Sequence, residues 1–201
     1  MKKNYIVYVG TELGTDSVIE DYCIIGVPPR GHKKGDLKTI IGSGAVIRSH
    51  TVIYAGNQIG RNFQTGNKAN IRELNIIGDN VSLGTLSVVE HHVQIGNNVR
   101  IHTQVFIPEY TIIEDDAWIG PNVVLTNAKY PLSPDAKKNL VGPTIKRGAK
   151  IGANTTLLPG VVIGENALVG AGSVVVKDVP DNTVVVGNPV RIINDMSKLP
   201  Y

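Results

Sequence analysis

The chain has 201 residues, which is enough for one sizeable hydrophobic core but short for two domains. Its net charge of +3 is too small and too dispersed to make nucleic acid the expected partner, although it suits an anionic small molecule. The single cysteine, Cys23, excludes an intrachain disulfide framework. No apolar run approaches the roughly 18–20 residues of a membrane span and no signal peptide is visible, so we expect a cytoplasmic protein that does not bind membranes.

Aliphatic residues first recur at every sixth position between residues 7 and 26, where they predict one short coil. A basic, proline- and glycine-rich loop, VPPRGHKKGDLKTI, follows over residues 27–40 and interrupts the series. Long loops on a regular scaffold are often functional. The cations of this loop are therefore candidates for binding the phosphates of a substrate, although they would equally suit a solvated surface. These candidates are Arg30, His32, Lys33 and Lys34.

The regular coils cover residues 41–127. The six-residue step holds without a break from Ile41 to Leu125, with Thr65 as the one non-aliphatic member. A period of six does not keep to one face of an α-helix, whereas short extended segments joined by tight turns do repeat in this way. Three hexads make one coil, because glycines that follow an isoleucine recur every 18 residues. These are Gly42, Gly60, Gly78 and Gly96. The pattern predicts an all-β fold, a triangular parallel β-solenoid with an aliphatic core.

Steps of 18 residues stack Glu73, His91, Glu109 and Asn127 at one corner of this solenoid, about 4.8 Å apart. A histidine between two carboxylates can have its tautomer fixed and its cationic form stabilised, as a general base requires. We therefore take His91 as the candidate base, Glu73 and Glu109 as its catalytic partners, and Asn127 as a substrate-binding residue. The alternative is a set of solvated turn residues. The neighbouring column through His92 has the composition of an ordinary turn.

A second loop with three prolines spans residues 128–144, and the six-residue step returns in late coils over residues 145–177. Residues 178–201 lose the repeat and are expected to form a short C-terminal cap, because the open end of a solenoid needs cover. Basic residues border the late coils and are candidates for binding the phosphates of a cofactor, or again a solvated surface. They are Lys146, Arg147, Lys150 and Lys177.

Residues 151–191, IGANTTLLPGVVIGENALVGAGSVVVKDVPDNTVVVGNPVR, together with the hexads from Ile41, strongly resemble the hexapeptide-repeat acyltransferase family. The resemblance covers nearly the whole chain. It implies a left-handed parallel β-helix with two loop excursions and a short cap, whereas the usual crossover rule predicts the opposite hand. It also implies a homotrimer, with acetyl-CoA as co-substrate in the groove between neighbouring prisms and active sites between subunits.

Two subgroups of this family, both acetylating amines on nucleotide-linked sugars, are the most similar. SVVEHHV (residues 87–93) resembles the histidine-bearing turn of enzymes that act on a UDP-linked 4-amino sugar, which implies that His91 is the base. Those enzymes have a glycine where this chain has Glu109. PEYTIIEDDAWIGPNVVLTN (residues 108–127) resembles enzymes for 3-amino sugars, which implies that Glu109 and Asn127 line the pocket of the acceptor amine.

The expected function is therefore acyl-CoA-dependent N-acetylation of a dTDP- or UDP-linked amino sugar in the biosynthesis of surface glycans, with His91 as general base and no metal. One alternative is an O-acetyltransferase that uses the same base on a sugar hydroxyl. Another is a zinc-dependent, carbonic-anhydrase-like protein of the same fold, in which His91, His92 and His102 would bind the metal across a subunit boundary. A purely scaffolding solenoid is a third possibility.

Overall fold

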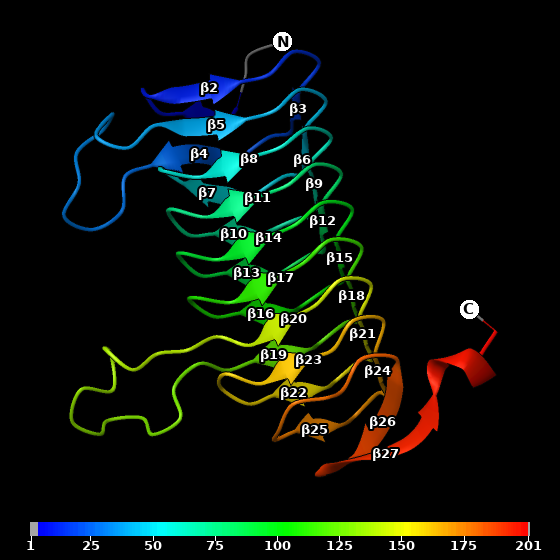
Figure 1. Cartoon of the computed structure of the whole chain (residues 1–201). Helices are drawn as coiled ribbons and strands as arrows, with labels where there is room; N and C mark the ends of the chain where they lie inside the picture. The colour runs from blue at the N-terminus through cyan, green and yellow to red at the C-terminus, as the bar shows by residue number, and fades with distance from the viewer. Residues whose placement is uncertain (1–3, 201) are drawn as a thin grey trace.

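The computed structural model describes residues 4–200 and shows a left-handed parallel β-helix of triangular cross-section (Figure 1). Its three faces, here called A, B and C, are parallel sheets in which each strand pairs with the strand one coil away. The predicted fold class is therefore confirmed. The strands are very short, most of them two residues, because a turn follows each one.

Face A contains β1 (Ile6–Val7), β4 (Ile24–Val27), β7 (Val52–Tyr54), β10 (Asn70–Ile71), β13 (Val88–Val89), β16 (Phe106–Ile107), β19 (Val124–Leu125), β22 (Thr156–Leu157) and β25 (Val174–Val175). Face B contains β2 (Thr11–Leu13), β5 (Thr39–Ile41), β8 (Gln58–Ile59), β11 (Ile76–Ile77), β14 (Gln94–Ile95), β17 (Ile112–Ile113), β20 (Thr144–Ile145) and β23 (Val162–Ile163). Face C contains β3 (Val18–Ile19), β6 (Val46–Ile47), β9 (Gln64–Thr65), β12 (Ser82–Leu83), β15 (Arg100–Ile101), β18 (Trp118–Ile119), β21 (Lys150–Ile151), β24 (Leu168–Val169), β26 (Thr183–Gly187) and β27 (Val190–Asp195).

The core is a stack of the aliphatic residues that recur at every sixth position. From the second coil onward these side chains are buried, because strand residues alternate between the inside and the outside of the prism. Thr65 is the exception in the series. Its hydroxyl lies 3.2 Å from that of Thr51 and accepts a hydrogen bond of 2.9 Å from the backbone N–H of Arg48. A polar residue is tolerated at this core position because its hydrogen bonds are satisfied.

The turns use two different devices. The left-handed backbone conformation falls mainly on the third turn residue, which is often Asn or Asp, as at Asn80 (φ 58°) and Asn98 (φ 57°). The glycines at the first turn position serve close stacking instead. A methyl group added at Gly78 would lie 2.8 Å from the carbonyl carbon of Gly96 in the next coil. Glycine is therefore needed there for space, not for a positive φ.

Both loops leave the prism along the same edge, where face A turns into face B (the A–B edge). Residues 28–38 connect β4 to β5, and residues 126–143 connect β19 to β20, so the two loops project from one side of the solenoid (Figure 1). At the other end of the chain, β26 and β27 pair in antiparallel fashion around a cis Asn188–Pro189 bond, and the 3-10 helix η1 (Met196–Lys198) follows. Within residues 4–200 no helix is long and apolar enough to cross a membrane.

Candidate functional site

The candidate residues stack along the A–B edge, between the two loops. The turns that follow β10, β13, β16 and β19 carry Glu73, His91, Glu109 and Asn127, respectively. Parallel pairing of Asn70 with Val88, Val88 with Phe106 and Phe106 with Val124 keeps these turns in register from coil to coil. The 18-residue step in the sequence therefore corresponds to one coil of the structure at this edge.

Glu109 and Asn127 form a direct pair. The side-chain Nδ2 of Asn127 donates a hydrogen bond of 2.7 Å to Glu109 Oε2 and lies 3.4 Å from the backbone carbonyl oxygen of Glu109. The other carboxylate oxygen, Oε1, lies 3.7 Å from His91 Nε2. That distance is too long for a hydrogen bond, but a third polar atom can lie about 2.8 to 3 Å from both groups. A polar atom that lies beside this pair can therefore contact both His91 Nε2 and Glu109 Oε1. We call this position the gap between His91 and Glu109.

The second nitrogen of His91 is occupied by its neighbour. Nδ1 of His91 lies 2.8 Å from Nδ1 of His92, with the two rings nearly perpendicular at 84°. The ring of Tyr110, one coil further on, lies 5.7 Å from that of His92 and 6.1 Å from that of His91, between centroids. Two aromatic rings, those of His92 and Tyr110, thus lie next to the ring of His91, whose Nε2 faces Glu109.

Glu73 is bound by an arginine. Nε and NH2 of Arg72 donate hydrogen bonds of 2.9 Å each to the two carboxylate oxygens of Glu73, while NH1 lies 3.4 Å from Glu90 Oε2. The guanidinium also lies 5.0 Å from the ring centroid of Tyr54. Burial alone would raise the pKa of Glu73. The hydrogen bonds from Arg72 and from the backbone, together with the charges of Arg72 and His91, outweigh burial and hold this pKa below its usual range.

The pKa of Glu90 shifts in the opposite direction. Burial raises the pKa of Glu90, and the neighbouring carboxylates of Glu109 and Glu73 add to the increase, although Arg72 and His91 oppose it. Glu73 and Glu90 thus share one guanidinium, and a third carboxyl group, that of Glu109, lies one coil further on. This excess of negative charge favours a cationic group beside His91 and Glu109.

Two buried asparagines hold the backbone of this edge. Asn75 Oδ1 accepts a hydrogen bond of 2.7 Å from the backbone N–H of Val93, directly after the histidines, and its Nδ2 donates to the carbonyl oxygen of Arg72 at 2.9 Å. Asn57 Nδ2 donates to the carbonyl oxygens of Tyr54 and Arg72 at 2.7 Å each, and Asn57 Oδ1 accepts a hydrogen bond from the N–H of Asn75 at 3.0 Å. Both side chains are fully buried. They fix the turns that present Arg72 and His91.

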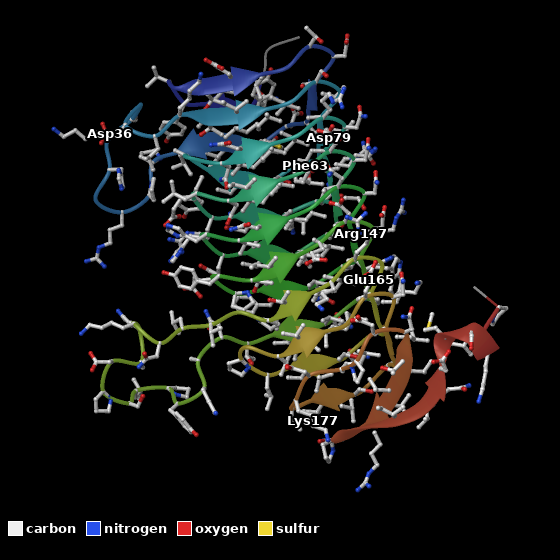
Figure 2. All side chains as sticks on the ribbon, viewed as in Figure 1. Asp36, Phe63, Asp79, Arg147, Glu165 and Lys177 are labelled. Atoms are coloured by element: carbon white, nitrogen blue, oxygen red, sulfur yellow. The ribbon has the colours of Figure 1, made fainter. Side chains whose placement is uncertain are left out.

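The basic candidates of the first loop lie on the same edge, at its N-terminal end. The Lys34 ammonium lies 5.1 Å from the ring centroid of Tyr8, and the backbone N–H of Lys33 donates to Asp36 Oδ2 at 2.7 Å, which closes a turn. Asp36 marks this loop in Figure 2. Arg30 and His32 belong to the same exposed segment.

The structure separates the basic candidates of the late coils. Lys146 and Arg147 lie on the edge between faces B and C, where they contact Asp181 and Asp115 at 3.8 and 3.7 Å, respectively. Figure 2 shows Arg147 on the side away from both loops. Lys150 lies in β21 on face C. Lys177 follows β25 and belongs to the A–B edge, so within one chain these four residues do not form one cluster.

Arg72 and Glu90 are not among the functional residues predicted from the sequence, in which His92 has the pattern of an ordinary turn residue. The first two are 18 residues apart and opposite in charge, which is the signal that places an ion pair on adjacent coils. The sequence gives no comparable signal for the contact between His92 and His91, because that contact depends on the left-handed backbone conformation of His92 (φ 58°). His102 lies on the edge between faces C and A, where its ring contacts that of Trp118 at 4.7 Å between centroids.

Comparison with known proteins identifies the family. The model described as bacterial transferase hexapeptide (six repeats) matches residues 76–109 and 142–177. Galactoside O-acetyltransferase from Escherichia coli (strain K12) is 38% identical over 96 residues, which cover 45% of this chain and 47% of that protein. The dTDP-3-amino-3,6-dideoxy-alpha-D-galactopyranose 3-N-acetyltransferase of Aneurinibacillus thermoaerophilus is 56% identical over 48 residues, which cover 24% of this chain and 25% of that enzyme.

Among solved structures, galactoside acetyltransferase in complex with coenzyme A aligns with a TM-score of 0.42 and 27% identity, covering 67% of this chain and 66% of that one. The chain spans half or less of the length of the curated relatives described above. These relatives are acetyltransferases, and their shared repeat is the one that builds this solenoid. Residues 76–109 and 142–177 of this chain carry the repeat of the hexapeptide transferase family.

Proposed function

We propose that the chain is an acyl-CoA-dependent N-acyltransferase that acetylates the amino group of a dTDP- or UDP-linked amino sugar. The observation that carries the proposal is the gap of 3.7 Å between His91 Nε2 and Glu109 Oε1, next to the hydrogen bond between Glu109 and Asn127. An amine nitrogen in this gap would contact both groups. The similarity to a sugar 3-N-acetyltransferase at 56% identity supports an amine acceptor.

In this mechanism His91 accepts a proton on Nε2 from the acceptor ammonium. The free amine then attacks the thioester carbonyl of acetyl-CoA. As the amide forms and the carbon–sulfur bond breaks, the nitrogen loses its second proton to the departing sulfur, so that CoA leaves as the thiol. Glu109, held by Asn127, orients the amine and stabilises its positive charge before the proton moves. No covalent enzyme intermediate is needed, because holding amine and thioester together already lowers the barrier. Glu73 affects the reaction only indirectly in this mechanism, although it lies one coil from His91, because Arg72 binds both of its carboxylate oxygens.

The electrostatics of the edge favour nitrogen over oxygen as the acceptor atom. An amino sugar enters as an ammonium ion near neutral pH, whereas a sugar hydroxyl is neutral. The edge carries three carboxylates, Glu73, Glu90 and Glu109, and a single guanidinium, which binds the first two, so the ammonium gains an attraction that the hydroxyl lacks. O-acetylation remains the second candidate, because a galactoside O-acetyltransferase is 38% identical over 96 residues and His91 could equally deprotonate a hydroxyl.

The proposal assigns the remaining candidates to binding. Arg30, His32, Lys33 and Lys34 of the first loop would hold the diphosphate of the nucleotide sugar. The late cations, Lys146, Arg147, Lys150 and Lys177, lie on different edges of one chain, and a site between subunits of a homotrimer would bring some of them to the phosphates of CoA.

The test is the release of CoA thiol from acetyl-CoA against a panel of dTDP- and UDP-linked 3-amino and 4-amino sugars, each beside its hydroxyl counterpart. We expect turnover with one amino sugar and a product heavier by one acetyl group at nitrogen. Turnover of a hydroxyl counterpart alone would replace the proposal by O-acetylation. If the folded protein releases no thiol with any member of the panel, both the amine and the hydroxyl acceptors are rejected. Metal analysis would then test the zinc alternative.

A further inference from the structure

His91 and His92 share a hydrogen bond that the proposed mechanism does not yet explain. Their Nδ1 atoms lie 2.8 Å apart, and the left-handed backbone of His92 (φ 58°) turns its ring toward His91. Two ring nitrogens at this distance share one proton, so one ring donates and the other accepts. The direction of this hydrogen bond decides which nitrogen of His91 keeps a lone pair.

A general base at this position needs its lone pair on Nε2, the nitrogen that faces Glu109. The Nδ1 atom of His91 must then carry the proton, although a neutral histidine in water carries it mainly on Nε2. A hydrogen bond from Nδ1 of His91 to Nδ1 of His92 favours the tautomer of His91 that carries its proton on Nδ1. It is compatible with both states of a base, because His91 keeps its Nδ1 proton before and after Nε2 takes up another.

We propose that His92 is a positioning residue whose neutral Nδ1 accepts the Nδ1 proton of His91 and so keeps the lone pair on Nε2. The inference rests on the proposed role of His91. If His92 donated this hydrogen bond instead of accepting it, His91 would carry its proton on Nε2 and could not act as a base there. The charged or titratable groups around the pair are Arg72, Glu73, Glu90, Glu109 and Tyr110.

Two substitutions of His92 test the effect of the hydrogen bond separately from the effect of the left-handed backbone conformation. His92→Leu removes the acceptor without straining the turn, because Leu74 adopts φ 61° at the equivalent position one coil earlier. His92→Asn keeps an acceptor that does not titrate, and asparagine adopts the same conformation at Asn80. Gln104→Leu is the matched control, since Gln104 is an exposed turn residue with φ 59° on another edge.

Kinetics with the best amino-sugar acceptor give the first readout. We expect His92→Leu to lower kcat at least about tenfold, with His92→Asn and the control within about threefold of the wild type. Wild-type turnover in His92→Leu would overturn the proposal, as would an equal loss in both His92 variants.

The second readout does not depend on the reaction. In the full chain labelled with ¹⁵N-histidine, NMR reports which ring nitrogen of each histidine carries a proton. We expect neutral His91 to be protonated on Nδ1 in the wild type and on Nε2 in His92→Leu. Protonation on Nε2 in the wild type would overturn the proposal. If His91 is protonated on Nδ1 but no acceptor is acetylated, the proposed function fails while the role of His92 in setting the tautomer stands.

Discussion

At the residue scale, the pair of Glu109 and Asn127 is the contact that orients the acceptor in the proposed mechanism. Asn127→Ala removes a hydrogen bond of 2.7 Å to a carboxylate, and hydrogen bonds to charged groups contribute about 1.5–3 kcal/mol. We therefore expect kcat/KM for the amino sugar to fall roughly ten- to a hundredfold, with the KM for acetyl-CoA unchanged. Steady-state kinetics with each substrate varied in turn measure both quantities.

The matching variant is Glu109→Gln, which keeps the size of the side chain but removes its charge. If the two residues act as a unit, the double variant should lose less than the product of the two single losses. Fully multiplicative losses would show that Asn127 acts independently of Glu109 and would contradict the proposed orientation of the amine.

Glu73 and Glu90 differ in how their charge affects stability. Burial raises the pKa of Glu73, but the contacts of Arg72, a backbone hydrogen bond and the charge of His91 together lower it. This carboxylate therefore adds stability above its unfolded-state pKa of about 4.3, and that stability is lost as the pH falls through the lower folded-state value. Burial raises the pKa of Glu90, so ionising Glu90 costs stability as the pH rises above about 4.3.

We therefore expect the two glutamine variants to change stability in opposite directions. Glu73→Gln should lower the free energy of unfolding more at pH 7 than at pH 4, and Glu90→Gln should raise it more at pH 7 than at pH 4. Both effects should stay below about 1 kcal/mol, because the groups are partly exposed to solvent. Denaturant unfolding of each variant at the two pH values measures the difference. Shifts of the same sign in both variants would contradict this account of Arg72.

At the scale of single elements, the buried asparagine ladder is what fixes the turn that carries the histidines. Asn75→Val fits the available space, since Val93 fills the equivalent position one coil later, but it leaves the N–H of Val93 without its acceptor. An unsatisfied buried group costs about 1–3 kcal/mol, so we expect a loss of that size in the free energy of unfolding, together with a lower kcat. Denaturant unfolding and thiol release measure the two effects.

The control for this variant is Gln94→Val, at an exposed position on face B, which should leave both quantities near their wild-type values. A loss of stability in Asn75→Val with unchanged kcat would show that the ladder supports the solenoid but does not position the site.

The repeating elements were predictable because burial imposes them. An aliphatic residue at every sixth position has one compact solution, and the step of 18 residues then fixes which turns lie above one another. The side-chain partners within a turn were not predictable in the same way. Arg72 could bind its neighbour Glu73 or the next coil, and only the rotamers decide between them. The spacing of the glycines also did not reveal their role, because Gly78 is needed for space and not for a positive φ.

At the scale of the whole molecule, exposed apolar side chains flank the A–B edge. Phe106 and Val124 on face A are 37% and 40% exposed, and Ile76 and Ile112 on face B are 55% and 39% exposed. A solenoid that stayed alone would leave these side chains in water. Packing of subunits along these faces would cover them and place the candidate site between chains, as a homotrimer requires.

We therefore expect sedimentation equilibrium to give about three times the chain mass of 21.5 kDa. Ile112→Lys should weaken the assembly and lower activity together, because it places a charge in the covered surface. The matched substitution Gln94→Lys, on the same face but polar to begin with, should have a smaller effect. A fully active species of 21.5 kDa would contradict a site formed between subunits.

The central claim is that His91 is the base of an acyl transfer to an amine at the A–B edge. The most direct measurement is kcat for thiol release from acetyl-CoA with the best amino-sugar acceptor, in the wild type and in His91→Gln, from pH 5 to pH 9. The account predicts a loss of about a hundredfold or more in the variant, with the fold unchanged. Near-wild-type turnover with the same pH profile would contradict it.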